Sequence, residues 1–119
     1  LTYKAAYSIL AFNQNNYKPT TNGKLIHETV TWLCKQQEVS GGFAPWLNHP
    51  VGENVYCTAV ALVALISMQD DAYRETIKRG YEYLCRTQLK SGIWAYHEIE
   101  DGASWGLFAL TQAEKYLEV

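Results

Sequence analysis

Three carboxylates lie within four consecutive positions of the chain, at Glu98, Glu100 and Asp101, and His97 precedes them. Carboxylates held this close repel one another, so one of them keeps its proton at a raised pKa. A group of this kind can act as a general acid. A plainer interpretation is that Asp101 caps a helix, while Glu98 and Glu100 stabilise the positive end of that helix from solvent. The residues by themselves leave both interpretations open.

Aromatic side chains gather near the expected starts of helices and in the loops before them, at Trp46, Tyr56, Tyr96 and Trp105. The face of an aromatic ring can stabilise a cation by about 0.5–2 kcal/mol. The alternative is that large rings fill gaps between helices.

Neither a metal nor a cofactor is expected. The three cysteines, Cys34, Cys57 and Cys85, are an odd number without CxxC spacing, which argues against a disulfide framework and a zinc site. Each is interpreted as a small buried hydrophobic residue. His49 and Glu53 lie near Cys57 in the sequence, which leaves a nucleophilic Cys–His pair open as a hypothesis.

Size and charge limit the classes of partner. The 119 residues amount to one domain or less, and the net charge of −2 gives no electrostatic basis for binding nucleic acid. No apolar run reaches the roughly eighteen residues needed to cross a bilayer. The first residue is Leu rather than Met, so we expect a processed or excised piece of a longer protein.

Helical periodicity predicts an all-α chain of five helices without a strand. The expected helices are 1–12, 24–37, 55–68, 71–88 and 101–116, with a polar loop at 13–23 and a long loop at 38–54. The third helix is apolar nearly all round, which predicts burial on most of its faces. We expect five residues to be buried: Ala61, Leu62, Leu65, Phe108 and Ala109. We expect Lys78, Glu82 and Arg86 to be exposed.

An internal repeat organises these helices. A shift of 51 residues superposes three pairs of positions: Gln37 and Gln88, Gly41 and Gly92, and Phe43 and Trp94. The repeat predicts one partial domain over 1–119, with units at about 24–68 and 71–116 after a first helix at 1–12.

Each copy of the repeat predicts a clasp at the end of a helix. The Gly supplies the positive φ that ends helices. The Gln side chain can bond backbone groups that are unpaired at the helix end. The ring of Trp94 is expected to fold back over the amide of Gln88.

The stretch with Arg79-Gly80, Tyr83-Leu84, Gln88, Gly92 and Trp94 resembles the QW motif of triterpene cyclases of the squalene–hopene cyclase kind. The same motif recurs more weakly in protein prenyltransferase β subunits. In the first copy, Glu28-Thr29 replaces the basic-Gly pair and Phe43 replaces the Trp. The resemblance implies antiparallel helix hairpins that form an arc of an α/α toroid. Helices 1–12, 55–68 and 101–116 would be its inner layer, and 24–37 and 71–88 its outer layer.

The resemblance also implies roles for the acidic cluster. Class II terpene cyclases carry a D-x-D-D-T-A motif before an inner helix, and the stretch from Glu98 to Ala103 reads E-x-E-D-G-A. On this comparison Glu100 would donate the proton, Glu98 and Asp101 would tune it, and His97 would hydrogen-bond to it. The zinc-binding Asp-x-Cys pair of the prenyltransferases is incomplete here, because Ala103 stands where the Cys would be.

The function implied is that of a terpene-cyclase-like or prenyltransferase-like module that binds an apolar isoprenoid. In such a module the rings of Trp46, Tyr56, Tyr96 and Trp105 would be the substrate-binding residues. Its partners would be that small molecule or the remainder of a larger toroid, and an active parent would be a class II cyclase-like isomerase or lyase. The parent would be cytoplasmic or would associate peripherally with a membrane. Two other classes stay open: a non-catalytic helical-repeat binding module, and a fragment of an (α/α)-barrel carbohydrate-active enzyme.

Overall fold

The computed structural model describes residues 1–16 and 23–119, and within them the fold is all-helical, as predicted. Its elements are α1 (Thr2–Gln14), α2 (Lys24–Lys35), α3 (Val55–Ser67), the short 3₁₀ helix η1 (Asp71–Tyr73), α4 (Arg74–Thr87) and α5 (Ile99–Leu117). The predicted loop 13–23 falls partly outside the described residues, and α1 occupies its first two positions. An isolated antiparallel bridge joins Phe43 to Asn54 inside the long loop.

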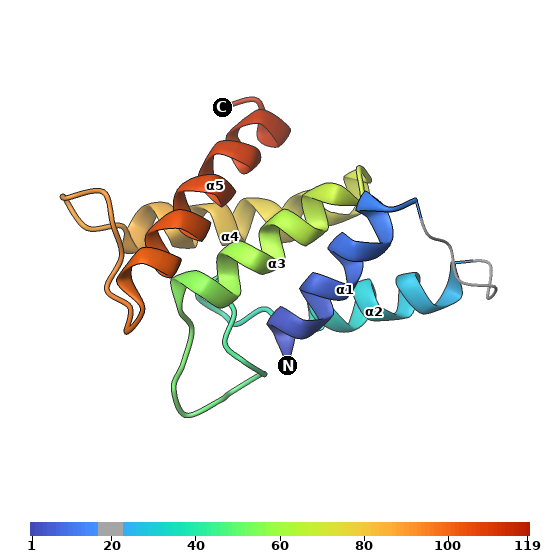
Figure 1. The fold of residues 1–119 in the computed structure, drawn as a ribbon, viewed down its shortest axis with the longest axis horizontal. Coiled ribbons are helices and arrows are strands. Elements are labelled where there is room, and N and C mark those ends of the chain that lie inside the picture. The colour runs from blue at the N-terminus through green and yellow to red at the C-terminus, as the bar shows by residue number, and fades with distance from the viewer. Residues whose placement is uncertain (17–22) are drawn as a thin grey trace.

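The helices pack in two layers. Helix α3 lies between α1 and α5, α4 packs against α3 and α5, and α2 packs against α1 (Figure 1). Because α3 contacts neighbours on most sides, Ala61, Leu62 and Leu65 are fully buried, as the apolar pattern predicts. The central position of α3 therefore follows from a sequence that offers no polar face to water.

On the other helices, four of the five predictions of burial or exposure are observed. Ala109 is buried, and Lys78, Glu82 and Arg86 are exposed. The prediction for Phe108 is wrong, because this residue is 49% exposed. Helix α5 turns its small residues toward α3 and α4, with Gly102, Gly106, Ala109 and Ala113 buried, and Phe108 lies beside this stripe on an open face.

The two copies of the repeat form loops with the same hydrogen bonds. The side-chain amide of Gln37 donates to the carbonyl of Gly41 over 2.9 Å, and that of Gln88 donates to the carbonyl of Gly92 over 2.8 Å. Gly41 and Gly92 share a φ of 93°. The predicted contact of Gln88 with backbone is confirmed, but its acceptor lies across the loop rather than in the last turn of the helix.

The aromatic position of each repeat is buried, although the two residues differ. Phe43 is 0% exposed and Trp94 is 2% exposed. The indole Nε1 of Trp94 donates to the carbonyl of Leu84, 3.0 Å away in the last turn of α4. The hydrogen bond to the last turn of α4 that we predicted for Gln88 is therefore made by Trp94. The side-chain amide of Gln88 is bonded within the loop and does not reach that carbonyl.

Helix α4 covers the first loop. The guanidinium of Arg79 donates to the side-chain oxygen of Gln37 over 3.1 Å and to the carbonyls of Glu38 and Val39 over 3.1 and 3.0 Å. The amide of Gln37 also donates to the carbonyl of Thr76 over 2.9 Å. The first loop therefore ties the chain after α2 to α4, because its Gln side chain and its carbonyls hydrogen-bond to that helix.

The matched glycines of the two loops give a prediction. A Cβ added at Gly41 would stand 2.4 Å from the carbonyl oxygen of Arg79, whereas one added at Gly92 meets no atom within 4 Å. Both Ala variants strain the same positive φ, by about 1–2 kcal/mol. We expect Gly41→Ala to destabilise the fold by about 1–3 kcal/mol more than Gly92→Ala, because only Gly41 lies under backbone. Urea titration of both variants measures the difference. Equal losses of unfolding free energy would contradict the close contact between Gly41 and the backbone of α4.

Candidate functional site

Aromatic rings from α1, α3, α5 and the loop before α5 meet on one surface. The ring of Tyr56 lies at its centre, with centroids 5.8 Å from Tyr3, 6.1 Å from Tyr96 and 6.5 Å from Trp105. The planes of Tyr56 and Tyr96 are stacked at 15°, while Tyr56 and Trp105 meet at 90°. Three of the four aromatic residues singled out from sequence are therefore neighbours in space.

The surface continues past Trp105. The ring of Tyr7 lies 6.0 Å from Trp105, and that of Phe108 lies 6.4 Å from Trp105. Ser104, Trp105 and Phe108 line a shallow hollow of about 180 Å³. We call the six residues Tyr3, Tyr7, Tyr56, Tyr96, Trp105 and Phe108 the aromatic face. Since Tyr7 and Phe108 are exposed, this face has room for an apolar ligand from the solvent side.

Local sequence features position these rings. The side chain of Asn54 accepts a hydrogen bond from the N–H of Cys57 over 2.8 Å, which caps α3 and fixes its first turn, where Tyr56 lies. A Cβ added at Gly102 would come within 3.0 Å of Val55 and 3.1 Å of Tyr96. The glycine thus lets α5 come close both to the start of α3 and to the side chain of Tyr96.

The hydroxyls of Tyr7 and Tyr56 form a hydrogen bond between α1 and α3. Burial is the largest cause that raises the pKa of Tyr56 above its usual range, and the hydrogen bond with Tyr7 raises it further. Tyr56 consequently stays neutral well above pH 10. At physiological pH it presents an uncharged ring with one bonded hydroxyl.

The raised pKa of Tyr56 predicts how stability depends on pH. Since the pKa is higher in the folded than in the unfolded chain, its stabilising contribution is complete below about pH 10 and is lost as the pH rises beyond it. We expect the free energy of unfolding to fall above pH 10, and to fall less steeply in Tyr56→Phe. Urea titrations at pH 8, 10 and 11 test this. A slope unchanged by the substitution would mean that Tyr56 ionises normally in the folded chain.

The acidic cluster lies at the start of α5. The helix begins at Ile99 with Glu98 as its N-cap residue, so the prediction that Asp101 caps the helix is wrong. Glu100 and Asp101 belong instead to the first turn, where negative charge is favoured. The three carboxylates and His97 are exposed, and no described residue donates a hydrogen bond to the carboxylates. The ring of His97 packs 4.4 Å from Tyr96, which joins the cluster to the aromatic face.

Other candidates from the sequence lie elsewhere. The indole of Trp46 packs on His49, with ring centroids 4.1 Å apart, rather than on the aromatic face. Glu53 accepts from the hydroxyl of Ser40, and Nδ1 of His49 accepts from the N–H of Val51, so neither side chain pairs with Cys57. Burial raises the pKa of Cys57. The Cys–His hypothesis is therefore wrong, because the loop turns His49 toward its own backbone.

Three residues of the aromatic face did not stand out in the sequence: Tyr3, Tyr7 and Phe108. Tyr3 and Tyr7 are four positions apart, the spacing that puts two side chains on one face of a helix, so the pattern of α1 carried a usable signal. Phe108 carried none, because its exposure depends on how α5 rotates against α3. Among the described residues, no group of His, Cys, Asp or Glu side chains could hold a metal ion.

The described residues thus form an all-helical fold with an open aromatic surface made by α1, α3, α5 and the loop before α5. Protostadienol synthase A from Arthroderma gypseum is 28% identical to the chain over 105 residues, which cover 81% of the chain and 14% of the synthase. The chain is thus distantly related in sequence to a terpene cyclase, and it spans only a small part of the length of that relative. No family model and no solved structure matches the chain. In the described part of the chain, every helix is too short or too polar to cross a membrane.

Proposed function

We propose that this chain is a terpene-cyclase-like module whose aromatic face binds an apolar isoprenoid. The observation that carries the proposal is the meeting of six aromatic side chains from three helices and a loop. Such a surface offers an isoprenoid chain apolar contact, and it offers a carbocation the negative faces of several rings. The similarity to protostadienol synthase A supports the same class of function.

The proposal includes the acidic cluster as a proton donor. Glu100 would donate the proton, with Glu98, Asp101 and His97 around it, on the side of the aromatic face where His97 packs against Tyr96. A carbocation formed there would need to be shielded from water. The aromatic face is open in this chain, so we propose that catalysis takes place only when the remainder of a larger toroid covers it. A parent enzyme would then be a cyclase-like isomerase or lyase.

Ligand binding tests the proposed function directly. We expect the chain to bind farnesol, a short acyclic isoprenoid, and we expect Trp105→Ala to weaken binding by about 3–30-fold, because one ring face and its apolar area are lost. Isothermal titration calorimetry measures both affinities. Trp32→Ala is the matched control, since Trp32 is 40% exposed on α2 and lies outside the aromatic face.

The alternative functions predict different titrations. A carbohydrate-active module would bind a cello-oligosaccharide and not farnesol, because exposed rings then stack on sugars. A repeat module that binds only other helices would bind neither ligand. Either result, or an equal loss of affinity in Trp105→Ala and Trp32→Ala, would contradict isoprenoid binding at the aromatic face.

A further inference from the structure

The rings of the aromatic face stand at steep angles around Trp105. The ring of Trp105 meets that of Tyr56 at 90°. It meets the rings of Phe108 and Tyr7 at 77° and 61°. Rings set at such angles surround a small ligand on several sides, whereas a flat stack offers it a single face. Because the face of each ring is electronegative, the arrangement suits a cation that several rings contact at once.

No described residue places a cation on these rings. The cation–π contacts of the described residues are made by Arg74, over the ring of Tyr116, and by Arg86, over the ring of Tyr83. Both arginines belong to α4, and neither ring belongs to the aromatic face. The aromatic face is therefore free to take a cation from solution.

Negative charge from the acidic cluster reaches the aromatic face. Burial is the largest cause that raises the pKa of Tyr96, and the charges of Asp101 and Glu98 raise it further. Asp101 also lies one helical turn before Trp105 on α5, the spacing that puts two side chains on one face. No described residue forms a salt bridge with these carboxylates. Their charge is thus left to attract a cation beside the rings.

We propose that the aromatic face binds a small quaternary ammonium cation of the choline class beside Trp105. Such an ion has no N–H group, so its methyl groups contact rings without the loss of hydrogen bonds to water. The hollow of about 180 Å³ lined by Ser104, Trp105 and Phe108 favours a small ligand. The carboxylates repel a phosphate group, which favours the free cation over a phosphocholine headgroup. The inference rests on ring geometry and charge, and it holds whether or not the aromatic face binds an isoprenoid.

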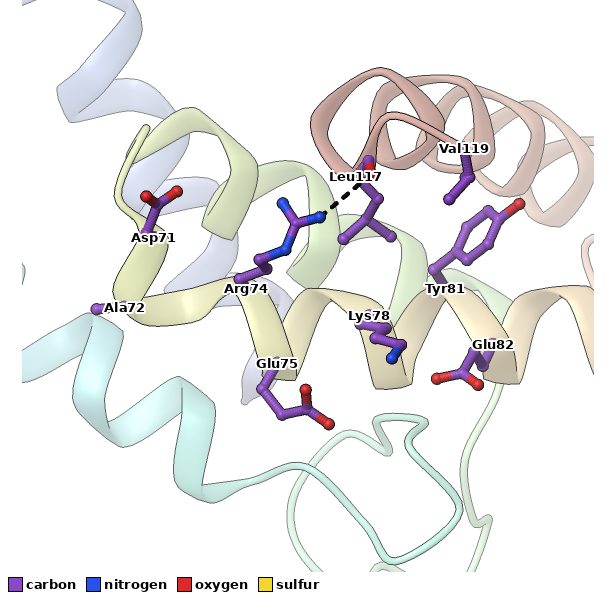
Figure 2. A pocket seen from close by; sticks show the side chains of 9 residues that line it. All are labelled: Asp71, Ala72, Arg74, Glu75, Lys78, Tyr81, Glu82, Leu117 and Val119. Carbon is purple, nitrogen blue, oxygen red and sulfur yellow. Dashed lines mark hydrogen bonds between the residues drawn. The ribbon is translucent and has the colours of Figure 1, made fainter.

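A groove beside α4 is an internal control, because it offers carboxylates without a set of rings. It has a volume of about 630 Å³ and is lined by Asp71, Ala72, Arg74, Glu75, Lys78, Tyr81, Glu82, Leu117 and Val119 (Figure 2). A cation attracted by carboxylates alone would bind in this groove as well as at the aromatic face.

Titration of choline into the ¹⁵N-labelled chain, followed by NMR, tests the proposal. The ligand control is the neutral alcohol in which a tert-butyl group replaces the trimethylammonium group. We expect saturable shifts of the indole N–H of Trp105 and of the backbone amides at 104–108, without matching shifts at 75–82 beside the groove. We expect choline to bind about 3–30-fold more tightly than the alcohol, because only the cation gains from the ring faces and the carboxylates.

Two variants examine the rings and the acidic cluster separately. Tyr96→Leu keeps apolar bulk but removes an aromatic face, and Asp101→Asn removes one negative charge. Each should weaken the binding of choline by about 3–10-fold. Glu82→Gln is the matched control for Asp101→Asn, since it removes a carboxylate from the groove, and it should leave the affinity unchanged. A dispersed amide spectrum shows that each variant is folded.

Several results would overturn the proposal. These are equal affinities for choline and the neutral alcohol, equal losses in Asp101→Asn and Glu82→Gln, or shifts confined to 75–82. Tighter binding of phosphocholine than of choline would also overturn it, because the occupant would then be a lipid headgroup. Farnesol binding without choline binding would remove this inference and leave the isoprenoid proposal standing. Choline binding without farnesol binding would do the reverse.

Discussion

Replacing Trp94 by Ala is expected to lower the free energy of unfolding by about 3–5 kcal/mol. The ring is buried between α4 and α5, and an added Cβ at Gly106 would come within 2.6 Å of it, so the fit on that side is close. The substitution also removes the donor that binds the carbonyl of Leu84. A domain of this size has about 5–15 kcal/mol of stability, so the loss would be a large share of the total. Urea denaturation followed by circular dichroism measures it.

Trp46→Ala is the control for this experiment. Trp46 is 48% exposed in the long loop, where its ring contacts His49. We expect it to cost under about 1 kcal/mol, because little buried area is lost. If Trp94→Ala cost no more than Trp46→Ala, the ring of Trp94 would be peripheral to the fold and the clasp would not hold α4 to α5.

Replacing Glu100 by Gln is expected to reduce cyclised product about a hundredfold or more in a longer polypeptide that carries this chain. Gln keeps the shape of the side chain but has no acidic proton to donate. The prediction rests on the proposal that the aromatic face and the acidic cluster are covered in a larger enzyme. The measurement is product formation from acyclic and epoxidised polyprenes, separated by gas chromatography.

Two comparisons make the result for Glu100 specific. Glu82→Gln removes a carboxylate from the exposed face of α4, a helix that contributes no ring to the aromatic face, and should leave the rate unchanged. The isolated chain should form no cyclised product, because its aromatic face is open to water, which quenches carbocations. Full activity of the Glu100→Gln variant would show that Glu100 is not the proton donor and that the cluster only stabilises the start of α5. Cyclised product from the isolated chain would show that the open face suffices.

The exact start of α5, beside the acidic cluster, could not be predicted from the local sequence. The sequence correctly indicated a helix start near Asp101, but the helix begins two residues earlier, at Ile99. Either start gives carboxylates a favourable place near the helix N-terminus, so local energetics do not distinguish the two. Gly102 lets α5 come close to Val55 at the start of α3 and to the side chain of Tyr96, and the approach to Val55 joins segments more than forty residues apart.

What the sequence alone determined is local: five helices, their apolar faces and the repeat. The loops of Gln37 and Gln88 could be anticipated because each closes over four residues around a glycine with positive φ, and such bonds depend only on nearby positions. The tertiary structure alone decided which loop is covered and which rings are exposed. Gly41 and Gly92 have the same φ, yet only Gly41 lies under Arg79, and Phe108 faces the open side of α5. These differences arise from packing between distant segments, which local periodicity does not encode.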